Sequence, residues 1–298
     1  MKKNILVIGG TGMLGKPVVL QLAQNPQFSV TLGSRKRPDW LPEEVKWIHL
    51  ELASPDSIAA ALLPGAYLYL NLSVDPSSRL TDFQPEREGL NNILAAAKKI
   101  GVSHICYLSS LIQRQLRKDG SAWWVASLKE QAVAAIKNSG LGYTIFYGST
   151  FMETIPFRFL KKDTITLAGR LPFPTYWIAA EDYARQVEAA IRMSTPTTHK
   201  TYTVQGPQKL RVDEALQIFA KNYSKGLSGK SIKVKRVPLQ LLALLGLVSR
   251  KMRYMYELLH ALDRFEEQPD HQATWQDLGE PSITIDVFAK SLKIAFQA

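Results

Sequence analysis

The stretch that decides the fold is residues 4–15, which read NILVIGGTGMLG. Residues 5–8 form a continuous apolar run bounded by glycines, which is typical of a strand buried on both faces of a parallel sheet. Residues 17–23 then repeat apolar side chains at helical spacing. We therefore predict a strand, a glycine loop and a helix that ends near Asn25-Pro26.

The loop carries three glycines at intervals of three, Gly9, Gly12 and Gly15. Glycine lets the chain turn sharply, lets a pyrophosphate approach the backbone, and lets helix and strand pack closely. The helix N-terminus offers unpaired N–H groups and partial positive charge to the phosphates. A loop in this context predicts a dinucleotide site. The residues expected to hold the pyrophosphate are Gly9, Gly10, Thr11, Gly12, Met13, Leu14 and Gly15.

A basic cluster follows the second predicted strand, which spans residues 29–34. An NAD-preferring site places an acid about twenty residues after the loop, where it holds the ribose 2′-hydroxyl. This chain has Arg35-Lys36-Arg37 there, with Ser34 beside it and no acid before Asp39. Guanidinium pairs bidentately with phosphate, so Ser34, Arg35 and Lys36 predict NADPH/NADP over NAD. The alternative is a basic surface turn without a ligand.

Strands and helices alternate through the rest of the first half. The strands are predicted over residues 45–50, 67–72, 104–108 and 143–147, with helices between them. Such alternation produces right-handed βαβ units and hence a Rossmann-type, doubly wound parallel sheet in an α/β fold. We expect residues 1–150 to form the dinucleotide-binding domain. Residues 151–298 are expected to form a smaller, mainly C-terminal substrate or lid region, with the 181–193 helix packing back on the sheet.

Composition narrows the class of protein. The 298 residues are 46% apolar and 21% charged, with a single cysteine, and the sequence has neither an export signal nor an apolar run that could cross a bilayer. These features predict a cytoplasmic protein. The net charge of +11 is spread along the chain without a stacking platform, so no specific nucleic-acid partner is expected. The dispersed histidines predict no metal site.

The chain resembles the NmrA-like group of the atypical short-chain dehydrogenase/reductases over roughly residues 1–220. The matching stretches include residues 9–15, 89–97, 107–110, 139–145, 151–153, 177–184 and 200–204, together with Lys129. The resemblance implies that the loop holds the pyrophosphate and that Arg35 reads the 2′-phosphate. It also implies further cofactor contacts beside the adenine, the ribose and the nicotinamide. These are Glu51 and Leu52, then Asn71, Leu72 and Ser73, then Gly148, Ser149, Thr150 and Phe151.

Catalysis in the resembling reductases uses a serine and a Tyr-x-x-x-Lys pair on one helix face. The lysine binds the ribose and lowers the pKa of the phenol, so that the tyrosine can donate a proton as hydride arrives. Ser109 or Ser110 supplies the serine, and Lys129 stands where the lysine belongs. The position four residues earlier is Val125, so the usual proton donor is missing.

Three functions are compatible with these residues. The first is an NADPH-dependent reductase (an oxidoreductase) of a small apolar carbonyl or quinone-like substrate. The second is a non-catalytic NADP(H)-sensing regulator or assembly factor with a protein partner, which Val125 favours. The third is a nucleotide-sugar epimerase-like enzyme, whose chemistry normally needs the missing tyrosine.

One segment is not explained by any of these three functions. Residues 238–248 read PLQLLALLGLV and precede Arg250, Lys251 and Arg253. The leucines surround most of the predicted helix, which favours a buried or lid helix over a partner interface. An interfacial membrane helix is the least favoured reading. The sequence leaves the oligomeric state open.

Overall fold

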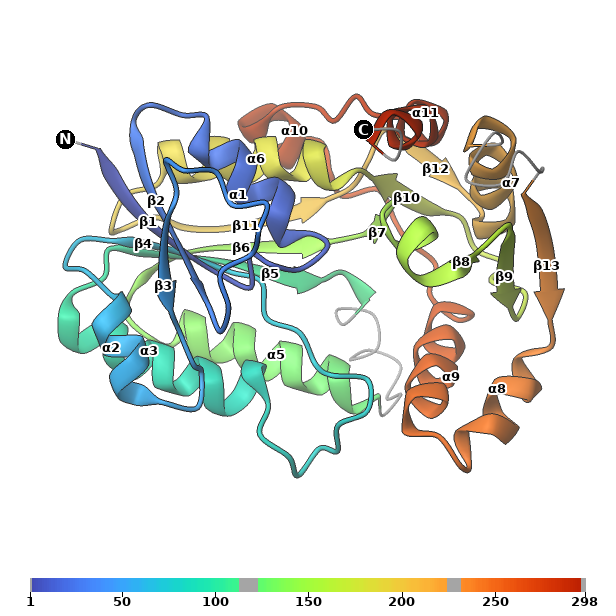
Figure 1. The fold of residues 1–298 in the computed structure, drawn as a ribbon, viewed down its shortest axis with the longest axis horizontal. Coiled ribbons are helices and arrows are strands. Elements are labelled where there is room, and N and C mark those ends of the chain that lie inside the picture. Colours follow the sequence, from blue (N-terminus) through green and yellow to red (C-terminus); the bar gives the residue numbers. More distant parts are fainter. Residues whose placement is uncertain (1, 113–122, 224–231, 296–298) are drawn as a thin grey trace.

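A computed structural model describes residues 2–112, 123–223 and 232–295 (Figure 1). Its main feature is a seven-stranded sheet in the order β11-β6-β5-β4-β1-β2-β3, in which every neighbouring pair is parallel. The strands are β1 (Lys3–Ile8), β2 (Phe28–Ser34), β3 (Lys46–His49), β4 (Tyr67–Leu70), β5 (His104–Ser110), β6 (Gly142–Gly148) and β11 (His199–Val204). The strand order reverses between β1 and β4, which is the arrangement of a Rossmann fold.

Helices cover both faces of this sheet, as Figure 1 shows. One face carries α1 (Gly15–Ala23), α6 (Ala180–Met193) and α10 (Gln272–Leu278). The other carries α2 (Pro55–Ala61), the π-helical turn η1 (Pro85–Gly89), α3 (Leu90–Ile100) and α5 (Trp124–Lys137). The predicted doubly wound α/β class is therefore confirmed.

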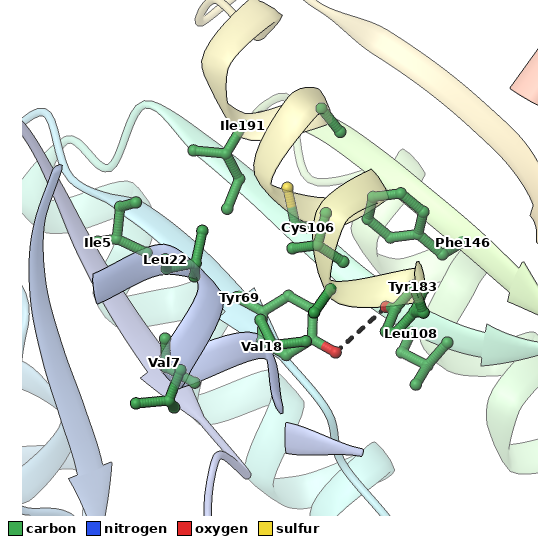
Figure 2. Close-up of a cluster of buried hydrophobic side chains, with 14 of the residues drawn as sticks. Ile5, Val7, Val18, Leu22, Tyr69, Cys106, Leu108, Phe146, Tyr183 and Ile191 are labelled. Carbon is green, nitrogen blue, oxygen red and sulfur yellow. Dashed lines mark hydrogen bonds between the residues drawn. The ribbon is translucent and has the colours of Figure 1, made fainter. Parts of the chain in front are cut away.

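The core between the sheet and α6 contains a polar contact. Tyr69 on β4 donates a hydrogen bond to the hydroxyl of Tyr183 on α6, 3.1 Å away, and both rings are fully buried (Figure 2). Val18 and Leu22 of α1 fill the space beside them. Each phenol thus has a partner, which buried hydroxyl groups require. Residues beyond position 150 therefore complete the core of the dinucleotide-binding sheet.

Local sequence signals set the helix ends. Ser54 accepts a hydrogen bond from the backbone N–H of Ser57 and so caps α2, which begins at Pro55. Gly101 ends α3 in the left-handed conformation, with φ of 82°. The helix α7 (Val212–Tyr223) carries the acids Asp213 and Glu214 in its first turn, where negative charge is favourable.

The remaining elements form a second layer beyond the carboxyl ends of β5 and β6 (Figure 1). One small sheet contains β12 (Gln208–Leu210), β10 (Thr175–Ile178) and β7 (Thr150–Phe151), and another contains β13 (Lys233–Val237), β9 (Thr164–Ala168) and β8 (Leu160–Lys161). The helical elements are η2 (Ile155–Phe159), α7, α8 (Leu239–Gly246), α9 (Arg250–Leu262) and α11 (Ile285–Ala295). In the described part of the chain, no helix combines the length and apolarity needed to cross a bilayer.

The leucine-rich segment departs from its expected position. It forms α8, whose eight residues are all described, and none of them is buried. Of the expected buried or lid helix, burial was therefore wrong, and the lid role stays a prediction. The leucine-rich composition predicts burial only where another element covers the helix on all sides, and here α8 lies at one extremity of the molecule (Figure 1).

Candidate active site

The candidate site lies where the strand order reverses, at the carboxyl ends of β1, β4, β5 and β6. Open parallel sheets bind ligands in the crevice formed at this point. Gly9 follows β1 here with φ of 82°, and a Cβ at this position would stand 2.1 Å from the carbonyl oxygen of Asn71, which follows β4. Only glycine lets the two strand ends approach so closely.

The glycine loop contains one glycine that the packing requires and one that it does not. A Cβ on Gly15 would meet the carbonyl oxygen of Gly9 at 2.2 Å, so Gly15 is required by the packing of α1 on β1. A Cβ on Gly12 would meet only that same oxygen, at an ordinary 3.6 Å. The fold itself therefore does not need glycine at position 12, whereas a phosphate group that approaches the backbone does.

The start of α1 is suited to an anion. Leu14 occupies the N-cap position and makes no side-chain capping hydrogen bond, and the first turn contains no acidic residue. The backbone N–H groups at this end thus have no side-chain acceptor, although those of Gly15 and Lys16 donate to the carbonyl oxygen of Gly12 at 3.1 and 3.0 Å. They fit the pyrophosphate of a dinucleotide.

The basic cluster lies at the end of β2. Arg35 and Lys36 are exposed, which leaves their side chains accessible to a phosphate. Ser34 is engaged elsewhere, because its hydroxyl donates to the carbonyl oxygen of Lys36 at 2.8 Å and accepts from the indole N–H of Trp47 at 3.0 Å. Arg37 is exposed as well, so the structure presents three cations at this turn and engages the serine hydroxyl in local hydrogen bonds.

A cavity of about 460 Å³ extends from the loop along the strand ends. Twelve of the residues predicted from sequence line it. These are Met13, Leu14, Asn71, Leu72, Ser73, Ser109, Ser110, Lys129, Gly148, Ser149, Thr150 and Phe151. Glu51 and Leu52 lie outside the cavity wall, beyond β3, where Asn92 of α3 donates to the carbonyl oxygen of Leu52 at 2.9 Å.

Lys129 enters the cavity wall from α5, and a buried carboxylate holds it. Its Nζ lies 2.5 Å from Oε1 of Glu86, which is in η1 and fully buried. The same oxygen accepts a hydrogen bond of 2.8 Å from the hydroxyl of Tyr107, while the buried Oε2 of Glu86 has no partner. Burial and the negative charge of Glu86 hold the pKa of Tyr107 well above its usual range. Tyr107 therefore anchors the ion pair and is a poor proton donor.

The serine side chains of the cavity wall differ in burial and in their contacts. Ser109 is buried and Ser110 is half-buried at the end of β5. Ser149 contacts the carbonyl oxygen of Tyr176 and a carboxylate oxygen of Glu267, each at 2.7 Å. The side chain of Ser149 is thus tied to the C-terminal layer, and only its backbone is left to face a cofactor.

The far wall of the cavity comes from the C-terminal layer. Tyr254, Leu258 and Leu262 of α9 line it, together with Phe265. The ring of Tyr254 packs at 5.8 Å against that of Trp123, in a T-shaped arrangement beside Val125. A tyrosine from α9 thus stands next to the valine that replaces the usual tyrosine.

A smaller apolar chamber of about 100 Å³ adjoins the main cavity and shares several wall residues with it. Trp177, Leu171, Phe173 and Met255 contribute to its wall. Arg158 lines both spaces and is the only charged side chain among the described residues of the chamber wall. The combined space suits an apolar molecule that carries one polar or anionic group.

Sequence reasoning missed Glu86, Tyr254 and Arg158. Glu86 follows Pro85 just before a helix, where an acid is ordinarily a surface residue of the first turn. Its partner Lys129 is 43 positions away, so no local pattern connects the two residues. Tyr254 lies in a region outside the resemblance, and its role in the wall depends on how α9 packs.

Comparison with known proteins gives a family. The model of the family described as NAD(P)H-binding matches residues 9–194. A photosystem II assembly factor, Ycf39, of Synechocystis is 22% identical over 262 residues, which is 85% of this chain and 76% of that protein. An NAD(P)H azoreductase of Xenophilus azovorans is 25% identical over 99% of both chains.

Solved structures share the fold. A nucleoside-diphosphate-sugar epimerase of Staphylococcus aureus superposes with a TM-score of 0.73 at 21% identity, and covers 96% of this chain and 99% of its own. The NADPH-dependent quinone oxidoreductase QOR2 of Escherichia coli gives a TM-score of 0.70 at 18% identity, over 97% and 99%. The family model covers more than half of the chain, including the glycine loop and most of the strand ends that line the cavity. This chain therefore belongs to the NAD(P)H-binding family.

Proposed function

We propose that this protein is an NADPH-dependent reductase of a small apolar substrate with a carbonyl or quinone-like group. The observation that carries the proposal is the cavity that joins Lys129 and the two serines to an apolar far wall. Two similar proteins support it by name, since one is an NAD(P)H azoreductase and another an NADPH-dependent quinone oxidoreductase. Residues 151–298 would supply most of the substrate side of the cavity.

The preference for NADPH rests on the basic cluster. Arg35 and Lys36 are exposed at the end of β2, where an acid would otherwise hold the ribose. A 2′-phosphate would pair with these two side chains. Ser34 would contribute little, since its hydroxyl already bonds within the turn.

Different residues of the cavity would bind the cofactor, orient the substrate and donate a proton. NADPH, when bound, supplies a hydride. Lys129 has three N–H donors, of which Glu86 takes one, so the others can hold the ribose hydroxyls. Ser109 or Ser110 would orient the substrate oxygen. Tyr254, the only tyrosine among the described wall residues, would donate its proton to that oxygen and regain one from solvent.

Deuteride transfer tests the proposal. NADPH labelled with deuterium at C4 would be incubated with the protein and a panel of quinones and azo compounds, and the products examined by mass spectrometry. We expect a labelled product that is lost in Lys129→Met and kept in Lys137→Met, which removes an exposed lysine of the same helix. NADPH that binds tightly while no label moves would contradict a reductase.

That second outcome would support the alternative, a non-catalytic NADP(H)-binding assembly factor. The specific observation in its favour is Val125, buried where a proton-donating tyrosine would stand. Relatives named as photosystem II assembly factors support it as well. An epimerase is the third candidate, and Val125 argues against it because that chemistry uses the missing tyrosine as a base.

A further inference from the structure

An apolar surface projects from the C-terminal layer. Five large apolar side chains of α8 and the following turn are exposed, and we refer to them as the apolar tip. They are Leu241, Leu244, Leu245, Leu247 and Val248, with exposed fractions of 44, 64, 41, 81 and 89%. Isolated exposed leucines are ordinary, but a contiguous group of this kind marks a binding surface.

The exposure results from how α8 is anchored. Leu239 and Leu242 pack against the core of the C-terminal layer. Positions 241, 244 and 245 fall at i, i+3 and i+4, so they share the opposite face of the helix, and Leu247 and Val248 follow in the turn after it. The helix is thus docked by one face and presents an apolar face outward, at an extremity of the molecule (Figure 1).

The segments that precede and follow the apolar tip in the chain are positively charged. Every charged residue between positions 232 and 256 is a cation, and all six are exposed. They are Lys233, Lys235, Arg236, Arg250, Lys251 and Arg253. Three acids offset part of this charge: Asp213 pairs with Arg236 at 3.3 Å, Glu257 pairs with Arg253 at 3.1 Å, and Asp75 lies within electrostatic reach of Lys251. The surface around the apolar tip remains net positive.

We propose that the apolar tip docks the protein on an anionic lipid surface. Leucine side chains that enter the boundary between headgroups and acyl chains leave water, while flanking lysines and arginines meet lipid phosphates. A second copy of the chain would bring two cationic surfaces together, and their repulsion opposes such a dimer. Nucleic acid would satisfy the cations but leave the leucines in water. Of these three occupants, an anionic lipid surface is the one that satisfies both features.

The proposal does not rest on the reductase function, but the two surfaces adjoin. The helix that follows the apolar tip, α9, contributes Tyr254 and Leu258 to the cavity wall. Arg250 also donates to the carbonyl oxygen of Ser77 at 3.4 Å, in the segment that brings Pro76 to the cavity. A lipid contact at the apolar tip would therefore lie directly before the helix that lines the cavity.

Vesicle flotation tests the proposal with the full chain. Wild-type protein is expected to float with vesicles of phosphatidylcholine containing about 30% phosphatidylserine and, at least about tenfold more weakly, with pure phosphatidylcholine. The variant Leu244→Gln/Leu247→Gln should lose at least about tenfold in partitioning to the anionic vesicles. The matched control is Leu63→Gln/Val287→Gln, which alters two exposed apolar residues elsewhere and should bind as wild type.

Two double lysine variants separate the contribution of charge from that of the apolar side chains. Lys233→Ser/Lys235→Ser should weaken anionic binding, whereas Lys98→Ser/Lys99→Ser on α3 should not. Wild-type protein that stays with the unbound fraction, or a Leu244→Gln/Leu247→Gln variant that floats like wild type, overturns the proposal. Sedimentation that detects a dimer abolished by the leucine changes overturns it in favour of self-association. NADPH binding is measured separately for each variant, as an independent check that the fold is intact.

Discussion

Nζ of Lys129 on α5 lies 2.5 Å from Oε1 of Glu86 in η1, and this ion pair sets the position of the one lysine among the described residues of the cavity wall. The carboxylate is fully buried, while the lysine side chain keeps 19% of its surface exposed. A cation held in this way cannot swing out to solvent without leaving a buried charge behind. Glu86 is therefore a positioning residue for Lys129.

Removing the lysine is expected to cost stability as well as function. In Lys129→Met the buried carboxylate of Glu86 loses its cation, which should lower the free energy of unfolding by about 3 kcal/mol. The double variant Glu86→Met/Lys129→Met should regain part of this loss, because no buried charge remains. Both variants should bind NADPH weakly. Urea denaturation and fluorescence titration measure the two effects, and a Lys129→Met protein as stable as wild type would contradict the ion pair.

Two glycines of the loop should respond oppositely to alanine. Gly15→Ala forces a Cβ toward the carbonyl oxygen of Gly9 and should destabilise the fold by about 2 kcal/mol or more. Gly12→Ala meets no close backbone atom, so its stability should stay within about 0.5 kcal/mol of wild type. The same methyl occupies the space of the pyrophosphate, and the Kd for NADPH should rise at least about tenfold. Unchanged affinity in Gly12→Ala would place the phosphates elsewhere.

Arg35 should discriminate between the two dinucleotides. Arg35→Asp removes a guanidinium expected at the 2′-phosphate, so the Kd for NADPH should rise at least about tenfold. The Kd for NADH, which has no such phosphate, should change little. Lys99→Asp on α3 makes an equal change in charge at an exposed position and serves as the control. Isothermal titration with both cofactors measures the ratio, and equal losses for both would contradict the assignment.

Tyr254 should act in proton transfer. Tyr254→Phe keeps the ring that packs on Trp123 but removes the hydroxyl. On an accepted substrate, kcat should fall by about 100-fold while KM and NADPH affinity stay near their wild-type values. Tyr256→Phe removes a hydroxyl two positions away, from a ring that stacks on His260, and should leave kcat unchanged. A full rate in Tyr254→Phe would assign the proton to another donor.

Glu153 should make stability depend on pH. Burial raises the pKa of this carboxyl to about 7, and its Oε1 accepts from the backbone N–H of Ala180 at the start of α6. The folded state therefore binds the proton more tightly than the unfolded chain, and stability is lost as pH rises from about 4.5 to 7. Glu153→Gln keeps the acceptor without the charge.

The variant should gain about 2 kcal/mol relative to wild type between pH 5 and pH 8. Chemical denaturation at the two pH values measures this difference. A constant offset between the two proteins would mean that Glu153 does not titrate in this range.

The sequence by itself determined the strand and helix order of the parallel sheet and the glycine loop between β1 and α1. The buried run before Gly9, the helix after Gly15 and the left-handed Gly101 are local patterns, and local backbone preference decides them. The same applies to α7 (Val212–Tyr223), which begins with two acids in its first turn. Strand alternation was enough to predict a doubly wound sheet, because short right-handed connections leave few other topologies.

Only the tertiary structure decided which distant groups meet. The leucine pattern does not record which element covers a helix, so α8 was expected to be a buried or lid helix, and none of its residues is buried. The pairing of Glu86 with Lys129 joins two helical segments across α3 and β5, and Tyr254 reaches the cavity only because α9 folds back over it. These contacts depend on the packing of whole layers. A free-energy balance over the entire chain sets that packing, and no local stretch of sequence records it.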